Sequence, residues 1–222
     1  MAKRNPPGGR PEPTPRRPMP KVAAAGRSPG VIAAFVAVGV LVAAIIGYAI
    51  YAVTRSGRPG APNIPGLVDY RVTDPKMLKR NHVRGAVTYP VSPPVGGDHN
   101  PIWQNCLGDI YPAAIANENA VHSLEHGAVW ITYRPDLPAD QVDTLAKRVR
   151  GTPYMFMSPF PGLDRPISLQ AWGLQLKLDS AADPRVDQFI RDFRIKAAPE
   201  PNASCSNGVT ATGTAPHNTA GG

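Results

Sequence analysis

The stretch NENAVHSLEHGAVWITY, from Asn117 to Tyr133, contains two local patterns in direct succession. Its first part predicts a helix that ends at Gly127, because glycine commonly closes helices. The apolar run that follows, from Ala128 to Tyr133, predicts a buried strand. A helix that leads directly into a strand indicates a domain in which both kinds of element are mixed.

Two histidines lie four residues apart in this helix, with Glu125 between them. One helical turn separates His122 from His126, so both side chains project from the same face and can bind one metal ion. The alternative is that cationic residues simply suit the last turn of a helix. Since His-x-x-x-His spacing is associated with metal sites without being specific for them, both interpretations stay open.

The pattern around this stretch predicts a small α+β domain. We expect a short β-like run at 85–89, an amphipathic helix over 139–150, strands at 154–157 and 167–178, and a second amphipathic helix over 183–195. The order strand, helix, strand, strand, helix predicts a mixed sheet packed by two or three helices.

Charge is unevenly shared along the 222 residues, whose formal net charge is +8. Residues 1–30 hold seven Lys/Arg and one acidic residue, and their Pro-rich composition predicts a disordered tail. Residues 54–222 hold 17 basic and 15 acidic residues, so most of the chain is nearly neutral. We therefore expect no nucleic-acid partner.

Residues 31–53 form an uncharged run that predicts a transmembrane helix. As a helix this run would span roughly 34 Å, against about 30 Å for a bilayer core. A cleaved signal peptide is the competing interpretation, although its apolar region is usually only about 7–15 residues. Basic residues are abundant before the span, and only Arg55 and Arg58 follow it closely. This asymmetry predicts a single-pass cell-membrane protein with a cytoplasmic N-terminus and an extracytoplasmic C-terminal domain.

Small residues recur every four positions in the span, at Gly39, Ala43 and Gly47. Such a face permits close helix approach and indicates a membrane-protein partner. The alternative is that small residues are simply common in membrane helices.

The chain after the span divides into a linker at 54–66, a domain at 67–197 and a flexible tail at 198–222. Cys106 and Cys205 should form a disulfide outside the membrane, which would tether this tail to the domain. Two free thiols are the alternative. Because no Cys-x-x-Cys is present, thiol–disulfide catalysis is not expected.

The histidines gather in the loop-rich part of the domain. We expect His122, His126 and His99 to bind the metal, since the glycine-bearing loop before His99 can adapt to the helix face. His82 would be a fourth ligand or would orient the others, and Glu125 would be a weak fourth ligand or a supporting residue. A structural, hydrogen-bonded role is the alternative for each of these histidines.

Neutral imidazoles suit zinc and copper alike, so the predicted cofactor is one Cu or Zn ion. Copper is slightly favoured because an extracytoplasmic protein meets copper stress. Met155 and Met157 would point to one face of a strand, which makes them candidate ligands for soft Cu(I). The alternative is two methionines that fill the core.

The pentad from His122 to His126 also has the residue order of inverted zinc peptidases, in which the glutamate acts as general base. Such enzymes need a long helix around the pentad and a downstream glutamate ligand. Here Gly127 and a strand follow at once, and the later glutamate, Glu200, lies in a Pro-rich segment. A non-enzymatic role is therefore favoured, either as a metal-binding domain or as an accessory subunit of an envelope membrane complex.

Together these motifs resemble a family of single-pass membrane proteins that is widespread in actinobacteria and catalogued as a domain of unknown function. The resemblance runs from His82 to Cys205 and is carried by His82-Val-x-Gly85, Tyr89, Pro93-Pro-x-x-Gly97-x-His99, Glu118, His122-Ser-Leu-Glu125-His126-Gly127 and Tyr133-x-Pro135. It implies an extracytoplasmic domain behind one anchor and a histidine site suspected of binding metal. It implies neither a particular metal nor catalysis.

Overall fold

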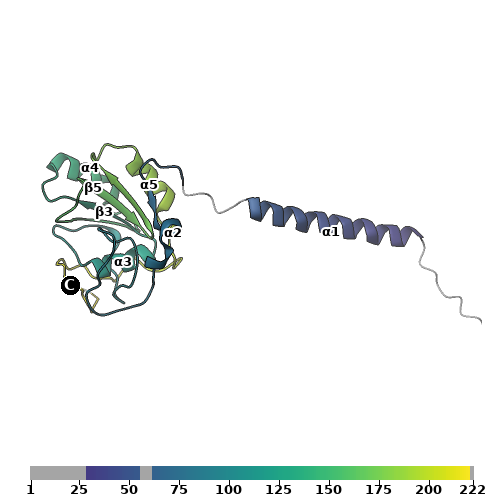
Figure 1. Ribbon diagram of the computed structural model, residues 1–222, viewed down its shortest axis with the longest axis horizontal. Coiled ribbons are helices and arrows are strands. Elements are labelled where there is room, and N and C mark those ends of the chain that lie inside the picture. Colours follow the sequence, from purple (N-terminus) through teal and green to yellow (C-terminus); the bar gives the residue numbers. More distant parts are fainter. Residues whose placement is uncertain (1–28, 56–61, 221–222) are drawn as a thin grey trace, which may run out of the picture. The chain divides into compact units, whose positions relative to one another are not determined.

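The computed structural model describes residues 29–55 and 62–220 of the chain (Figure 1). The chain separates into two compact units, Met1–Arg58 and Pro59–Gly222. Most of the expected N-terminal tail at 1–30 and the centre of the expected linker at 54–66 lie outside the described residues.

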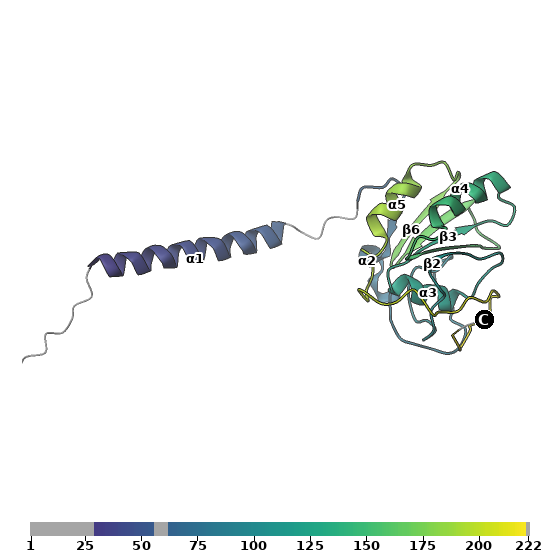
Figure 2. The same ribbon diagram turned by 180° about the vertical axis from the view of Figure 1, so that it is seen from behind.

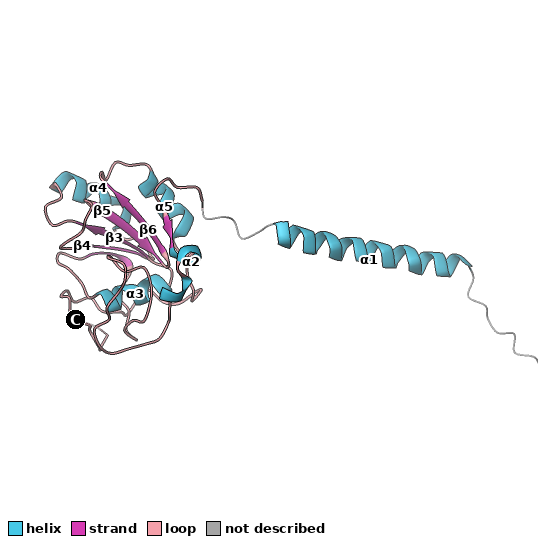
Figure 3. Cartoon of the chain, in the orientation of Figure 1, coloured by secondary structure: helices cyan, strands magenta, loops and turns pink. Residues whose placement is uncertain are grey.

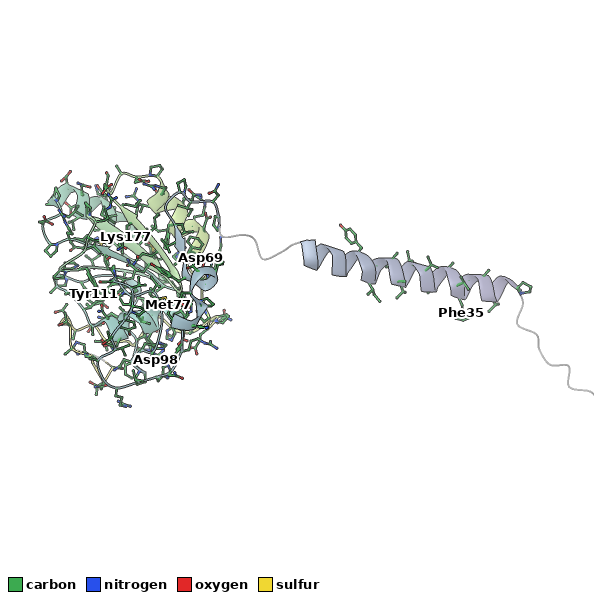
Figure 4. All side chains as sticks on the ribbon, in the orientation of Figure 1. Phe35, Asp69, Met77, Asp98, Tyr111 and Lys177 are labelled. Carbon is green, nitrogen blue, oxygen red and sulfur yellow. A yellow bond between two sulfur atoms is a disulfide. The ribbon has the colours of Figure 1, made fainter. Side chains whose placement is uncertain are left out.

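The first unit contains helix α1 (Pro29–Arg55). Its section Pro29–Tyr48 is long and apolar enough to cross a membrane. Apolar side chains cover its surface, and Phe35, which is 74% exposed, projects freely from it (Figure 4). The expected apolar helix is therefore present in the described part of the chain.

Within residues 62–220, the second unit is built on a six-stranded sheet in the order β1-β6-β5-β3-β4-β2 (Figure 3). The strands are β1 (Val68–Asp69), β2 (Leu107–Ile110), β3 (Val129–Tyr133), β4 (Met155–Pro159), β5 (Ile167–Ala171) and β6 (Leu174–Leu178). Strands β2 and β3 each run parallel to β4, and the other pairs are antiparallel. The predicted mixed sheet of an α+β domain is confirmed.

Helices cover both faces of this sheet (Figures 1 and 2). The helices of the unit are α2 (Tyr70–Thr73), the 3₁₀ turn η1 (Pro75–Met77), α3 (Asn117–Glu125), α4 (Ala139–Val149) and α5 (Arg185–Phe193). Helices α4 and α5 lie on one face, and α3 lies on the other. Side chains alternate along a strand, so Val129 and Ile131 of β3 join the core beneath α4 and α5, whereas Trp130 joins the core beneath α3.

Three local features differ from the sequence predictions. The single strand expected over 167–178 is the hairpin β5–β6, because the chain turns at Trp172-Gly173, where Gly173 has a φ of +71°. The β-like run at 85–89 is irregular chain, and the short strand β2 was not predicted. Short, loop-flanked strands carry too few residues for a period-2 pattern to show.

The C-terminal strap, as we call residues 198–220, lies against the domain, where a flexible tail tethered at Cys205 was expected. The Cys106–Cys205 disulfide joins it to the start of β2, as the sequence predicts. Backbone hydrogen bonds continue the attachment, from Asn105 N to Val209 O at 2.8 Å and from Gly213 N to Ala114 O at 2.7 Å. Backbone pairing therefore orders a segment whose own side chains are too polar and small to predict order.

Candidate metal centre

Helix α3 presents His122 to the interior, and the helix itself is almost completely buried. Gly127 ends the helix with a φ of +98°, so the chain turns sharply into β3. His126 is the residue that caps the helix, and it is buried as well. The two histidines therefore sit at the last turn of a nine-residue helix that is held between the sheet and the loops.

His82 and His99 come to this helix on two loop segments that pair with each other. Val83 N donates to His99 O at 2.7 Å, and His99 N donates to Asn81 O at 3.0 Å. The ring centroids of His82 and His99 are 5.0 Å apart, and each lies within 4.9 Å of the centroid of His122. Backbone pairing thus assembles three imidazoles into one compact triangle.

Backbone carbonyls fix the orientation of three imidazoles. Nδ1 lies 2.8 Å from Gly97 O in His99, 2.7 Å from Asn100 O in His122 and 2.7 Å from Ser204 O in His126. A carbonyl oxygen only accepts, so Nδ1 carries the proton and the lone pair of each neutral ring is on Nε2. This is the arrangement that metal-binding histidines typically have.

Glu125 completes a buried group with these rings. Its side chain is 2% exposed, and its Oε2 lies 3.0 Å from His99 Nε2. That separation is short enough for an ion pair, but the alignment is poor and His99 Nε2 has no hydrogen-bond partner among the described residues. A buried carboxylate this close to an imidazole nitrogen needs a cation or a proton between them.

The inner group, as we call His82, His99, His122 and Glu125, meets the distance condition for one ion. Each residue offers one ligand atom, and these atoms all lie within 4.8 Å of one another. His122, His126 and Glu200 form a second group that meets the same condition, and His126 Nε2 lies 3.9 Å from Glu200 Oε2. We call His126 and Glu200 the outer pair. His122 is therefore a member of both groups, whereas His126 belongs only to the second one.

Burial keeps His122 uncharged. Burial is the main cause that lowers the pKa of His122, the nearby imidazoles of His126 and His99 contribute as well, and the resulting pKa is about 3. Burial also lowers the pKa of His126, against the opposing effect of the Ser204 carbonyl. A histidine with a lowered pKa offers its lone pair to a metal at neutral pH without first losing a proton.

The structure keeps the other candidates away from this site. Met155 and Met157 are fully buried in the core beneath α4 and α5, whereas their neighbour Phe156 packs on the α3 side. Neither thioether reaches the histidines, because alternation along β4 directs both to the opposite face. His217 lies in the strap near α3, where its backbone N donates to Asn119 Oδ1 at 2.9 Å. It belongs to neither group.

Sequence reasoning did not propose Glu200 as a ligand of the favoured site, nor the two tryptophans beside the rings. Trp103 lies with its ring centroid 5.0 Å from that of His126, and Trp172 lies 5.9 Å from His99. The sequence feature that could have indicated Glu200 is Cys205. A disulfide from Cys205 to Cys106 brings the residues just before Cys205, including Glu200, close to α3.

The fold and the site define an α+β domain with a buried candidate metal centre. The chain belongs to the family described as "Protein of unknown function (DUF3105)", whose match covers residues 82–207, more than half of the chain. The matched range contains every residue of the inner group and of the outer pair. The resemblance to a family of unknown function is confirmed at this level. No curated protein and no solved structure matches the chain.

Proposed function

We propose that this protein is a membrane-anchored, extracytoplasmic metal-binding protein that holds one Cu or Zn ion at the inner group. The observation that carries the proposal is the orientation of His99 and His122, whose Nε2 lone pairs converge beside the buried carboxylate of Glu125. His82 would supply the third imidazole. Burying this set without a cation would leave the carboxylate poorly compensated.

The ligand types support a divalent ion. Three imidazoles and one carboxylate suit Zn²⁺ and Cu²⁺, while Cu(I) prefers thiolate and thioether ligands. Met155 and Met157 lie on the other face of the sheet, so neither candidate thioether is available to the inner group. The site is therefore better suited to Cu²⁺ or Zn²⁺ than to Cu(I).

The nearest protein cation does not replace the metal. Arg80 Nε lies 3.8 Å from Glu125 Oε1, and its side chain is 54% exposed. An ion pair at this distance, with a hydrated guanidinium, contributes little. A bound divalent ion would compensate the Glu125 carboxylate much better.

Location at the cell membrane is part of the proposal. The apolar character of α1, the excess of basic residues before it and the Cys106–Cys205 disulfide support a cytoplasmic N-terminus and a domain in an oxidising space. Accessibility of the domain to protease in intact cells tests this topology, because a cytoplasmic domain would remain protected.

Metal binding is tested by isothermal titration of the metal-depleted full chain in mild detergent with Zn²⁺ and Cu²⁺. We expect saturation at one ion per chain. The His99→Ala/His122→Ala variant should lose this binding, and the matched His217→Ala variant should keep it, because His217 lies outside both groups. Equal binding by the double variant and the parent chain would end the proposal.

A role as an accessory subunit is compatible with metal binding and would use α1. Gly39 and Gly47 are flanked by open space within the described chain, so a neighbouring helix can approach there. Replacing Gly39, Ala43 and Gly47 by Leu should release a stoichiometric membrane partner in a detergent pull-down. Recovery of the same partner with the variant would exclude this use of α1.

A further inference from the structure

Two sets of side chains share His122, and they differ in exposure. Three of the four residues of the inner group are buried, whereas the outer pair ends at Glu200, whose side chain is 46% exposed. Building on the proposed function, we propose that the metal ion binds first at His122 and the outer pair, and then moves to the inner group. The outer pair is thus a loading position for a divalent transition-metal ion.

His122 makes the two positions alternatives. Its Nδ1 donates to Asn100 O at 2.7 Å, so Nε2 carries the one lone pair that is free for a metal. A single lone pair binds a single ion at a time. The two positions therefore hold one ion in total, although together they present five histidine and glutamate side chains besides His122 itself.

The distances allow a short transfer. The ring centroid of His122 lies 4.5 Å from that of His126, 4.9 Å from that of His99 and 4.8 Å from that of His82. An ion that keeps His122 exchanges the outer ligands for the inner ones one at a time. It retains its charge throughout, and no redox partner is required.

The charges around the two positions favour arrival of the metal ion at the outer pair. The exposed carboxylate of Glu200 attracts a cation, whereas the exposed side of the inner group carries the guanidinium of Arg80, close to Glu125. A cation is drawn toward the carboxylate and repelled by the guanidinium. Arrival past Glu200 is therefore faster than arrival past Arg80.

The strap holds the outer pair in place before metal arrives. Glu200 N donates to Glu125 O at 3.2 Å, which ties the strap to the end of α3. Ser204 O accepts from His126 Nδ1 at 2.7 Å, and the next residue, Cys205, is in the disulfide. Both ligands of the outer pair are thus positioned by the same short segment.

Stopped-flow mixing of the metal-depleted full chain with Cu²⁺ tests the inference. Quenching of tryptophan fluorescence reports arrival, since Trp103 lies beside the outer pair and Trp172 beside His99. We expect Glu200→Gln to lower the second-order loading rate constant by about three- to tenfold, because one steering charge is lost. Binding at equilibrium should stay at one ion per chain, because the inner group is intact.

Two variants serve as controls. Glu200→Asp keeps the charge and should load at nearly the rate of the parent chain. Asp179→Asn removes an exposed carboxylate that pairs with Arg165, outside both groups, and should leave the rate unchanged. An unchanged rate in Glu200→Gln, or uptake of two ions per chain, would overturn the loading position while metal binding at the inner group stands. Absence of uptake by the parent chain would instead remove the proposed function, and the loading position with it.

Discussion

The Nε2 atom of His99 lies 3.0 Å from Oε2 of Glu125, and both side chains are buried. Because His99 Nδ1 donates to Gly97 O, the other ring nitrogen, Nε2, is the one that faces the carboxylate. Two electron-rich atoms at this separation repel each other unless a cation or a proton lies between them. This contact is the strongest reason to expect an ion at the inner group.

The first prediction concerns Glu125→Gln, which keeps the shape of the side chain and removes its charge. We expect affinity for Zn²⁺ or Cu²⁺ to fall by about 10–100-fold, the range found when groups that support a metal site are removed. The metal-free protein should be at least as stable as the parent, because a poorly compensated buried charge has been removed. Titration calorimetry and thermal unfolding measure the two effects. A large loss of stability in the metal-free variant would show that Glu125 has a structural role instead.

The second prediction concerns the stability of the metal-free protein between pH 6.5 and pH 4. The pKa of His122 falls from its ordinary value of 6.5 to about 3 because the side chain is buried. In this interval the unfolded chain binds a proton that the folded chain does not, so the free energy of unfolding decreases as the pH falls. The slope should reach at most about 1.4 kcal/mol per pH unit for this histidine, and His126 adds to it.

Urea unfolding at several pH values measures this dependence, and His122→Gln should flatten it. The ion-paired Asp183 and Asp187 also have lowered pKa values, but their contribution is lost only around and below their ordinary value of 3.8. The interval above pH 4 therefore reports mainly on the histidines. A parent chain whose stability does not change there would contradict the burial of a neutral His122.

Sequence patterns predicted the parts of this molecule that repeat over several residues. Strand β3 was visible as a continuous apolar run, and the amphipathic helices α4 and α5 were visible because their apolar residues follow the helical period. The helix end at Gly127 was visible because few residues adopt a positive φ there. The mixed sheet followed from the order of these elements and is confirmed.

What sequence did not predict depends on backbone atoms and distant pairing. The carbonyls of Gly97, Asn100 and Ser204 orient the imidazoles, and a carbonyl has no side-chain signature. Glu200 reaches His126 because the strap pairs with the chain near Cys106. For the same reason, the split of the histidines into an inner group and an outer pair could not be read from their spacing.

The third prediction concerns the Cys106→Ala/Cys205→Ala variant. The two cysteines are 99 residues apart in sequence. In the chain-entropy description, losing a disulfide that closes a loop of this size lowers the free energy of unfolding by about 4–5 kcal/mol. We expect a clear fall in the thermal midpoint, together with slower metal loading, because Ser204 O would no longer hold His126 firmly. Reduction of the parent chain should reproduce both effects. Loading at the parent rate would show that backbone pairing alone positions the strap.

The fourth prediction concerns Gly127→Ala, at the junction between α3 and β3. A Cβ at this position would lie 2.8 Å from the Cβ of Ala198 and 3.1 Å from the Cα of Ile195, and the φ of +98° is unfavourable for alanine. The left-handed conformation alone costs about 1–2 kcal/mol, and the contacts with Ile195 and with Ala198, the first residue of the strap, add to this. Because His126 immediately precedes the strained position, the outer pair should be disturbed as well.

Gly85→Ala is the matched control for this substitution. A Cβ there has no neighbour within 4 Å in the described chain, and Gly85 is not among the glycines with positive φ. Alanine at such a position is neutral or slightly stabilising, because it reduces the freedom of the unfolded chain. In urea unfolding, the free energy of unfolding of Gly127→Ala should therefore be lower than that of Gly85→Ala. The difference should be at least the roughly 1–2 kcal/mol that the left-handed conformation costs. Equal free energies of unfolding would mean that the backbone at the end of α3 adapts to the substitution at little cost. His126 would then not be held in a fixed position beside Glu200.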